Sequence, residues 1–113
     1  MQFFNTACFI VILLLVSCAS VQARSAPTRY GELTCRQYYE AVKKLQKQEE
    51  TLAIQLSETW LYGYVSAQRG VTTMDPEVFV RFSMDVMDTC IKNLDSPLLE
   101  VVNKVPFRST GEY

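Results

Sequence analysis

Cysteine is the residue type in this 113-residue sequence whose chemistry most constrains the protein, and it occurs at positions 8, 18, 35 and 90. Cys8 and Cys18 fall in or just after an apolar N-terminal segment, which leaves Cys35 and Cys90 in the rest of the chain. Two such thiols usually pair once an exported protein reaches an oxidising compartment. We therefore predict a Cys35–Cys90 disulfide, with two free buried thiols as the alternative. The long loop that it closes would stabilise the fold by about 4 kcal/mol.

The sequence contains no histidine, which argues against most catalytic sites. Without histidine there are no Ser–His or Cys–His nucleophile pairs, and the commonest general base near neutral pH is missing. Two sulfurs alone do not complete a zinc shell. The adjacent carboxylates Glu49 and Glu50 lie in a polar stretch with no sign of a cleft. We predict no catalytic residue, no metal site and no cofactor.

The N-terminal segment has the features of an export signal and offers two cleavage sites. Residues 7–16 form an apolar stretch that suits the core of a signal peptide and is too short to span a bilayer. Residues 21–23 fit a small-x-small cleavage site, which would release a periplasmic protein beginning at Arg24. Residues 15–18 fit a lipobox, which would leave a membrane-anchored lipoprotein with a lipid on Cys18. We favour release, with the lipoprotein as the alternative.

The charges are balanced and mixed along the chain. Eleven Lys and Arg residues face twelve Asp and Glu residues, and all of them lie at or after position 24. Such a balance argues against a nucleic-acid partner. The densest basic group, Lys43, Lys44 and Lys47, is interpreted as a solvated helix face.

Two helices are predicted in the first half of the exported chain. Thr34 and Gln37 have the spacing of a capping box, so the first helix should begin there. Residues 46–50 are wholly polar and form either a break or an exposed helical turn. A second helix is expected over residues 51–69, ended by Gly70. Its apolar residues follow a near four-residue spacing, which consists of Leu52, Leu56, Trp60, Tyr64 and Ala67 and is flanked by Ala53, Ile54, Leu61 and Val65.

Two further helices are predicted in the second half. Asp75 followed by Pro76 is typical of a helix start, and Ser96-Pro97 begins a short fourth helix. The apolar face of the third helix is expected to contain Phe79, Phe82, Val86, Cys90 and Ile91, with Met87 at its edge. The predicted fold is all-α, a small four-helix bundle stapled by one disulfide. We divide the chain into a signal peptide at 1–23, a flexible arm at 24–32, a helical domain at 33–105 and a loose polar tail at 106–113.

Three stretches together resemble the HdeA/HdeB family of small periplasmic acid-stress proteins. They are LTCRQYY at the start of the domain, WLYGYVSAQRG in its middle and FSMDVMDTCIKNLDSPLLEVV at its end. The resemblance spans residues 33–105. It implies that Cys35 and Cys90 form the disulfide of the family, and that Trp60 lies in the core or a dimer interface.

The resemblance implies an exported holdase, a chaperone that loosens in acid and binds unfolding periplasmic proteins. Below about pH 3 most carboxylates are protonated, and the net charge rises to about +11. The residues expected to form a client-binding or homodimer surface, with ordinary core as the alternative, are Leu56, Trp60, Tyr64, Phe79 and Phe82. Met84 and Met87 are expected to become accessible with them.

The alternative function is a periplasmic or lipid-anchored binding or inhibitor protein of the immunity type. Its partner would be one specific envelope protein, and its contact patch would consist of exposed Tyr38, Tyr39, Tyr62 and Tyr64. Contact with the membrane is expected only if Cys18 carries a lipid.

Overall fold

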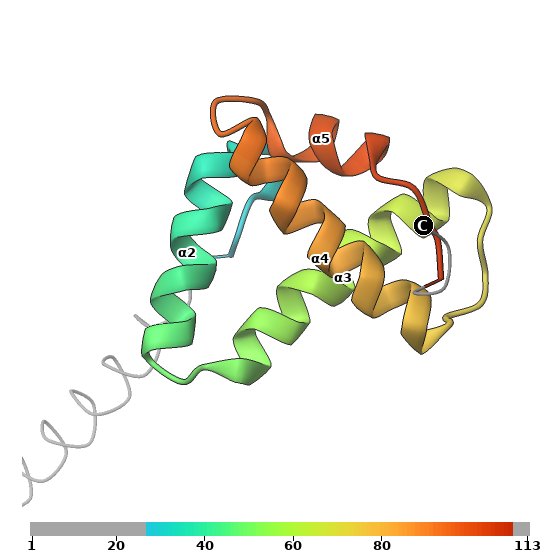
Figure 1. The fold of residues 1–113 in the computed structure, drawn as a ribbon, viewed down its shortest axis with the longest axis horizontal. Helices are drawn as coiled ribbons and strands as arrows, with labels where there is room; N and C mark the ends of the chain where they lie inside the picture. The colour runs from blue at the N-terminus through green and yellow to red at the C-terminus, as the bar shows by residue number, and fades with distance from the viewer. Residues whose placement is uncertain (1–26, 110–113) are drawn as a thin grey trace, which may run out of the picture.

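The computed structural model describes residues 27–109, which form a helical bundle (Figure 1). Within this range the elements are η1 (Tyr30–Glu32), α2 (Cys35–Lys47), α3 (Thr51–Arg69), α4 (Pro76–Lys92) and α5 (Leu98–Lys104). The described part contains four α-helices, one 3₁₀ turn and no strand longer than a single bridge, so the predicted all-α bundle is confirmed. The predicted signal segment, with Cys18, lies outside the described residues.

Local capping explains where α2 and α4 begin. The Thr34 hydroxyl accepts the backbone N–H of Gln37 at 3.3 Å, and the Gln37 side chain accepts the backbone N–H of Thr34 at 2.9 Å. The carboxylate of Asp75 accepts the N–H of Glu77 at 2.9 Å in the first turn of α4. Each cap satisfies backbone donors that have no partner within the helix. Both predicted starts are confirmed.

The polar stretch at residues 46–50 is a break. Helix α2 ends at Lys47, and Glu49 then takes a left-handed conformation with φ of 57°. Helix α3 ends where predicted, at Gly70, whose φ of 67° is favourable without a side chain. In Figure 1 these two reversals place α3 alongside both α2 and α4.

The buried face of α3 includes Leu61 and Val65, which flank the four-residue spacing, rather than most of the spaced residues themselves. The side chains turned toward the core are Leu61, Tyr62, Val65 and Ser66, whereas Leu52, Leu56 and Trp60 are exposed. A four-residue spacing marks one helix face but does not say whether that face is buried. Since α3 is apolar on more than one side, the partner helices decide which side enters the core.

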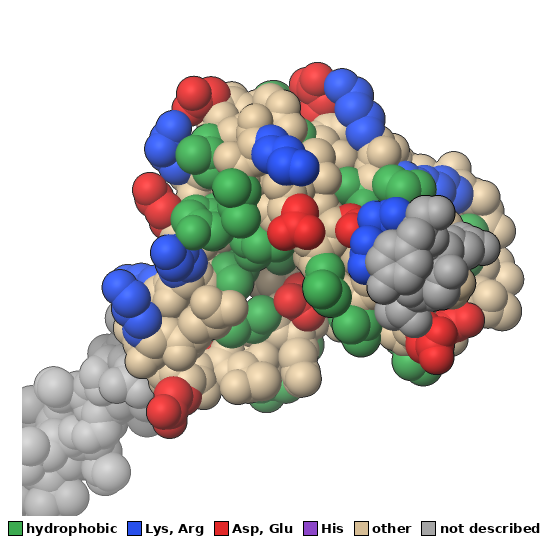
Figure 2. Space-filling model, viewed as in Figure 1, with side chains coloured by type: hydrophobic (Ala, Val, Ile, Leu, Met, Phe, Trp, Pro, Cys, Tyr) green, Lys and Arg blue, Asp and Glu red, His purple; other side chains and the backbone are tan. Residues whose placement is uncertain are grey.

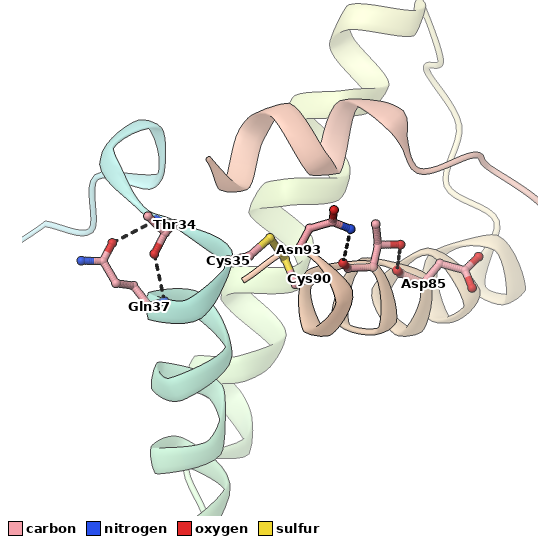
Figure 3. The surroundings of a disulfide bond; sticks show 7 residues. Thr34, Cys35, Gln37, Asp85, Cys90 and Asn93 are labelled. Carbon is pink, nitrogen blue, oxygen red and sulfur yellow. Dashed lines mark hydrogen bonds between the residues drawn. A yellow bond between two sulfur atoms is a disulfide. The ribbon is translucent and has the colours of Figure 1, made fainter. Parts of the chain in front are cut away.

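The disulfide forms the centre of the core. Cys35 and Cys90 are bonded, their Cα atoms are 4.9 Å apart, and both residues are fully buried. Figure 3 shows the bridge joining the first turn of α2 to the C-terminal end of α4. Nearby, the N–H of Cys35 donates to the Ser96 carbonyl at 2.9 Å and the N–H of Leu98 donates to the Leu33 carbonyl at 2.8 Å. The predicted pairing is confirmed.

Helices α4 and α5 complete the core. Phe82, Val86 and Cys90 are buried as predicted, but Ile91 is 48% exposed, so its assignment to the core face was wrong. Ile91 directly follows Cys90, and the next residue along a helix is rotated by about 100°. The buried side chains of α5 and its C-terminal cap are Leu98, Val101, Val102 and Val105.

Both segments that flank the predicted domain make contacts with it. On the N-terminal side, Tyr30 stacks on Trp60 with ring centroids 4.3 Å apart. On the C-terminal side, Phe107 packs against Tyr62, and Arg108 pairs with Asp85. The expectation of a flexible arm is therefore wrong for Tyr30, and the expectation of a loose polar tail is wrong for Phe107 and Arg108. Residues 24–26 and 110–113 lie outside the described part.

Candidate functional site

The five residues predicted to form one surface occupy three different environments. Leu56 and Trp60 are exposed on α3, Tyr64 and Phe79 are partly buried, and Phe82 is only 1% exposed. Phe82 thus belongs to the core in this structure. The remaining four lie on two separate surfaces.

The first surface is the α3 ridge, which we define as Leu52, Leu56 and Trp60. These side chains follow one another every four residues and are 68%, 62% and 44% exposed. Large apolar side chains in a row are unusual on the surface of a small monomer and often mark an interaction site. The ridge leads into an aromatic stack in which Trp60 lies between Tyr30 and Tyr64, with the Trp60 and Tyr64 centroids 5.5 Å apart.

The stack also fixes the N-terminal segment on α3. Besides its ring contact with Trp60, the Tyr30 hydroxyl donates a hydrogen bond of 3.0 Å to the Ser57 hydroxyl. Tyr30 therefore covers one side of Trp60 and leaves Leu52 and Leu56 open. The sequence offered no sign of this contact, because Tyr30 lies 30 positions before Trp60 in a polar stretch.

The second surface is a groove of about 250 Å³ between α2, α3 and α4. Figure 2 shows apolar side chains gathered around a hollow on this face. The groove is lined by Val42, Gln46, Glu58, Phe79, Val80, Ser83, Met84 and Met87. Phe79, Met84 and Met87 were predicted to become accessible together, and the structure brings all three to this groove.

Glu58 places a carboxyl group in the otherwise largely apolar groove. Burial raises the pKa of Glu58 above its ordinary value, because a partly desolvated carboxylate is less stable than the neutral acid. Burial also raises the pKa of Tyr38, and the negative charge of Glu58 adds to that rise. Acid therefore neutralises the groove before it neutralises an ordinary surface glutamate.

Asp85 is the second carboxylate in a special environment. It is 9% exposed, and its two oxygens accept hydrogen bonds from Nε and Nη2 of Arg108 at 3.0 and 3.1 Å. Nε of Arg81 lies 3.3 Å from the same carboxylate. The hydrogen bonds from Arg108 and the charges of both arginines outweigh burial and lower the pKa of Asp85. In Figure 3 the Asp85 carboxylate points away from the disulfide on the same helix.

Phe107 packs beside this ion pair. Its ring stacks on Tyr62 at 4.8 Å and meets Phe82 edge-on at 5.2 Å. The guanidinium of Arg69 lies 4.6 Å from the Phe107 centroid and donates to the backbone carbonyl of Val105 at 2.6 Å. A partial signal for the cluster is present in the sequence, since Arg81 and Asp85 are four residues apart on one helix. The approach of residues 107 and 108 depends on the tertiary fold.

The tyrosine patch of the alternative function does not form. Tyr38 and Tyr62 are each only 4% exposed, and Tyr64 is partly covered in the Trp60 stack. Tyr39 carries the ammonium of Lys43 over its ring at 5.0 Å. The four side chains therefore offer no common contact surface.

Two features are absent from residues 27–109. No three of their Cys, Asp and Glu side chains lie close enough together to hold a metal ion. None of their helices is both long and apolar enough to cross a bilayer.

Comparison with known protein families shows which family the chain belongs to. The model of the HdeA/HdeB family matches residues 5–100, which is most of the chain. The chain belongs to the HdeA/HdeB family. No curated protein and no solved structure shows significant similarity to it. Proteins of this family are periplasmic chaperones and not enzymes.

Proposed function

We propose that this protein is an exported acid-stress holdase that binds unfolding proteins of the periplasm. The observation that carries the proposal is the α3 ridge, where two leucines and a tryptophan remain exposed although the core is complete without them. Burying such side chains against a client releases about 25 cal/mol for each Å² of apolar surface. The groove supplies a second apolar surface on another side of α3.

The charge composition supports an acid trigger. At pH 7 twelve carboxylates offset eleven bases, and in strong acid only the bases remain charged. The resulting self-repulsion weakens the packing of the helices. Because the chain has no histidine, the change depends on carboxylates and occurs in acid rather than between pH 6 and 8.

A second copy of the chain is the proposed partner of the ridge at neutral pH. An exposed ridge is a liability in a protein that waits for stress, and a homodimer would cover it until acid separates the subunits. Size-exclusion chromatography with light scattering at pH 7 and pH 2 tests this step. A monomer at both pH values would contradict it.

Export is the other part of the proposal. We expect release after residue 23, so that intact mass analysis of protein from the periplasm finds an N-terminus at Arg24. An acylated N-terminus at Cys18 would replace the soluble holdase by a lipid-anchored one.

The test of function is light scattering from an acid-sensitive client protein at pH 2, with and without this protein. We expect suppression of aggregation by the native chain and weaker suppression by a Leu52→Ser, Leu56→Ser double variant. Ile91→Ser is the matched control, because it also removes an exposed apolar side chain but lies off the ridge on α4. Client aggregation that is unchanged by the native chain would refute the proposed function. An equal loss of client protection in the double variant and in Ile91→Ser would exclude the ridge as the client-binding surface.

A further inference from the structure

Three residues after α5 cross the junction of α3 and α4, and we call residues 106–108 the C-terminal strap. In Figure 1 the chain turns after α5 and runs back toward these two helices. The strap is attached on both sides. Arg108 makes a two-point ion pair with Asp85 of α4, and Arg69 of α3 covers the ring of Phe107.

We propose that the strap is an acid-released cover over an aromatic binding surface formed by Tyr62 and Phe82. At neutral pH the side chain of Phe107 occupies this surface. In acid the strap detaches, and the surface becomes available to another aromatic side chain. The inference rests on the proposed function only for the identity of that incoming group, an aromatic side chain of an unfolding protein.

The arrangement of charges around Asp85 gives the reason for release. Its carboxylate lies between two guanidinium groups, at 3.0 Å from Arg108 and 3.3 Å from Arg81. Once Asp85 is protonated, the two-point attraction is lost and the two cations remain as close neighbours. Repulsion between them then favours movement of the strap, because Arg81 is fixed on a helix and Arg108 is not.

The neighbouring charges do not replace the lost carboxylate. Arg69 from α3 and Lys104 from α5 are cations that stay charged in acid. On α4, Glu77 lies one turn before Arg81, and exposed Asp88 follows Asp85 by three residues. Both are carboxylic acids, so strong acid removes their negative charge as well. Among these described neighbours of the strap, acid thus leaves only the positive charges.

The strap itself shows what chemistry the covered surface accepts. A planar ring lies flat on Tyr62 with an interplanar angle of 20° and meets Phe82 at 86°. Both are favoured aromatic geometries. Phe82 is buried while the strap is in place, so its predicted role in client binding requires such an opening.

Phenylalanine NMR can follow the strap directly. Of the six phenylalanines, only Phe79, Phe82 and Phe107 lie after residue 23, so ¹³C-labelled phenylalanine gives a simple spectrum of the processed, oxidised protein. We expect the Phe107 ring signals to move to the positions of an unpacked ring as the pH falls, while circular dichroism still shows the helices. Phe107 signals that change only together with helix loss would overturn the proposal.

Two variants test the attachment at pH 6. We expect Asp85→Asn and Arg108→Gln to show released Phe107 signals at pH 6 and to bind bis-ANS several-fold more strongly than the native chain. Arg108 lies outside the helices, so this variant keeps the test decisive if Asp85→Asn does not fold. Asp95→Asn is the control, because it breaks the exposed 3.2 Å pair with Arg36 near the disulfide. Native Phe107 signals in a folded Arg108→Gln variant would refute the strap.

A client aggregation assay on the same samples separates the two proposals. Released Phe107 signals without client protection at pH 2 would support the strap proposal and refute the holdase proposal. Client protection with Phe107 still packed supports the holdase and refutes the strap.

Discussion

Helix α4 carries two attachments that differ in chemistry. At its C-terminal end the Cys90 sulfur is covalently bonded to Cys35 of α2. Five residues earlier, Asp85 holds the C-terminal strap through an ion pair with Arg108. Both residues are buried, yet they face different sides of the helix (Figure 3). One attachment is independent of pH and the other is not.

If the bundle loosens in acid as we propose, this difference preserves its chain topology. Protonation does not affect a disulfide bond, so α2 and α4 remain joined at one end. The lowered pKa of Asp85 means that its ion pair stabilises the fold above the ordinary aspartate range. That stabilisation is lost as the pH falls through the lowered value. Acid should therefore open the strap side of the bundle and leave the disulfide side closed.

Removing the disulfide has the largest expected effect. A Cys35→Ala, Cys90→Ala double variant loses a cross-link between residues 55 positions apart, which should lower the free energy of unfolding by about 4 kcal/mol. Urea titration followed by circular dichroism measures this loss. The same loss at pH 7 and pH 4 would agree with a pH-independent attachment, and a loss confined to one of the two would contradict it.

Removing the charge of Asp85 should cost less and should depend on pH. We expect Asp85→Asn to lower the free energy of unfolding by about 2 kcal/mol at pH 7, between the values typical of exposed and buried pairs. In the native chain the same contribution disappears in strong acid, so the two urea titration curves should converge there. A difference that stays constant down to pH 2 would show that Asp85 acts through packing.

Shortening Phe107 tests the aromatic half of the strap. Phe107→Ala removes a partly buried ring that contacts Tyr62 and Phe82, and we expect a loss of about 1.5 kcal/mol at pH 7. Thermal unfolding at pH 7 and pH 3 provides the comparison. If strap release precedes unfolding in acid, the substitution should matter less at pH 3 than at pH 7. An equal loss of stability at both pH values would show that the contribution of Phe107 does not depend on the ion pair of Asp85.

Local patterns explain why much of the fold was predictable. The capping box of Thr34 and Gln37, the Asp75-Pro76 start and the Gly70 stop all act within a few residues, and each formed as expected. The disulfide followed from counting thiols in a chain that we expect to be exported, and the family resemblance led to the same pair.

Interactions between distant parts of the chain explain the failures. The spacing of Leu52, Leu56 and Trp60 marked a face of α3 correctly but could not say that this face would remain exposed. The polar composition of the tail predicts a loose segment. Phe107 followed by Arg108 is the one sign of contact in this tail. The residues that they contact, Tyr62 and Asp85, lie on helices that only the tertiary fold brings close to the tail.

Glu58 provides the opposite case to Asp85 and the smallest predicted effect. Burial raises its pKa, so ionised Glu58 destabilises the fold at neutral pH, and this penalty disappears as the pH falls through the raised value. Because the group is only partly buried, screening by solvent limits the effect, and we expect Glu58→Gln to raise the free energy of unfolding at pH 7 by about 0.5 kcal/mol. Urea titration should find no gain at pH 3, where native Glu58 is already neutral. The two carboxylates then respond to acid with opposite signs: protonation removes a favourable contact at Asp85 and an unfavourable one at Glu58. A gain that persists at pH 3 would instead assign the benefit to better contacts of the glutamine in the groove.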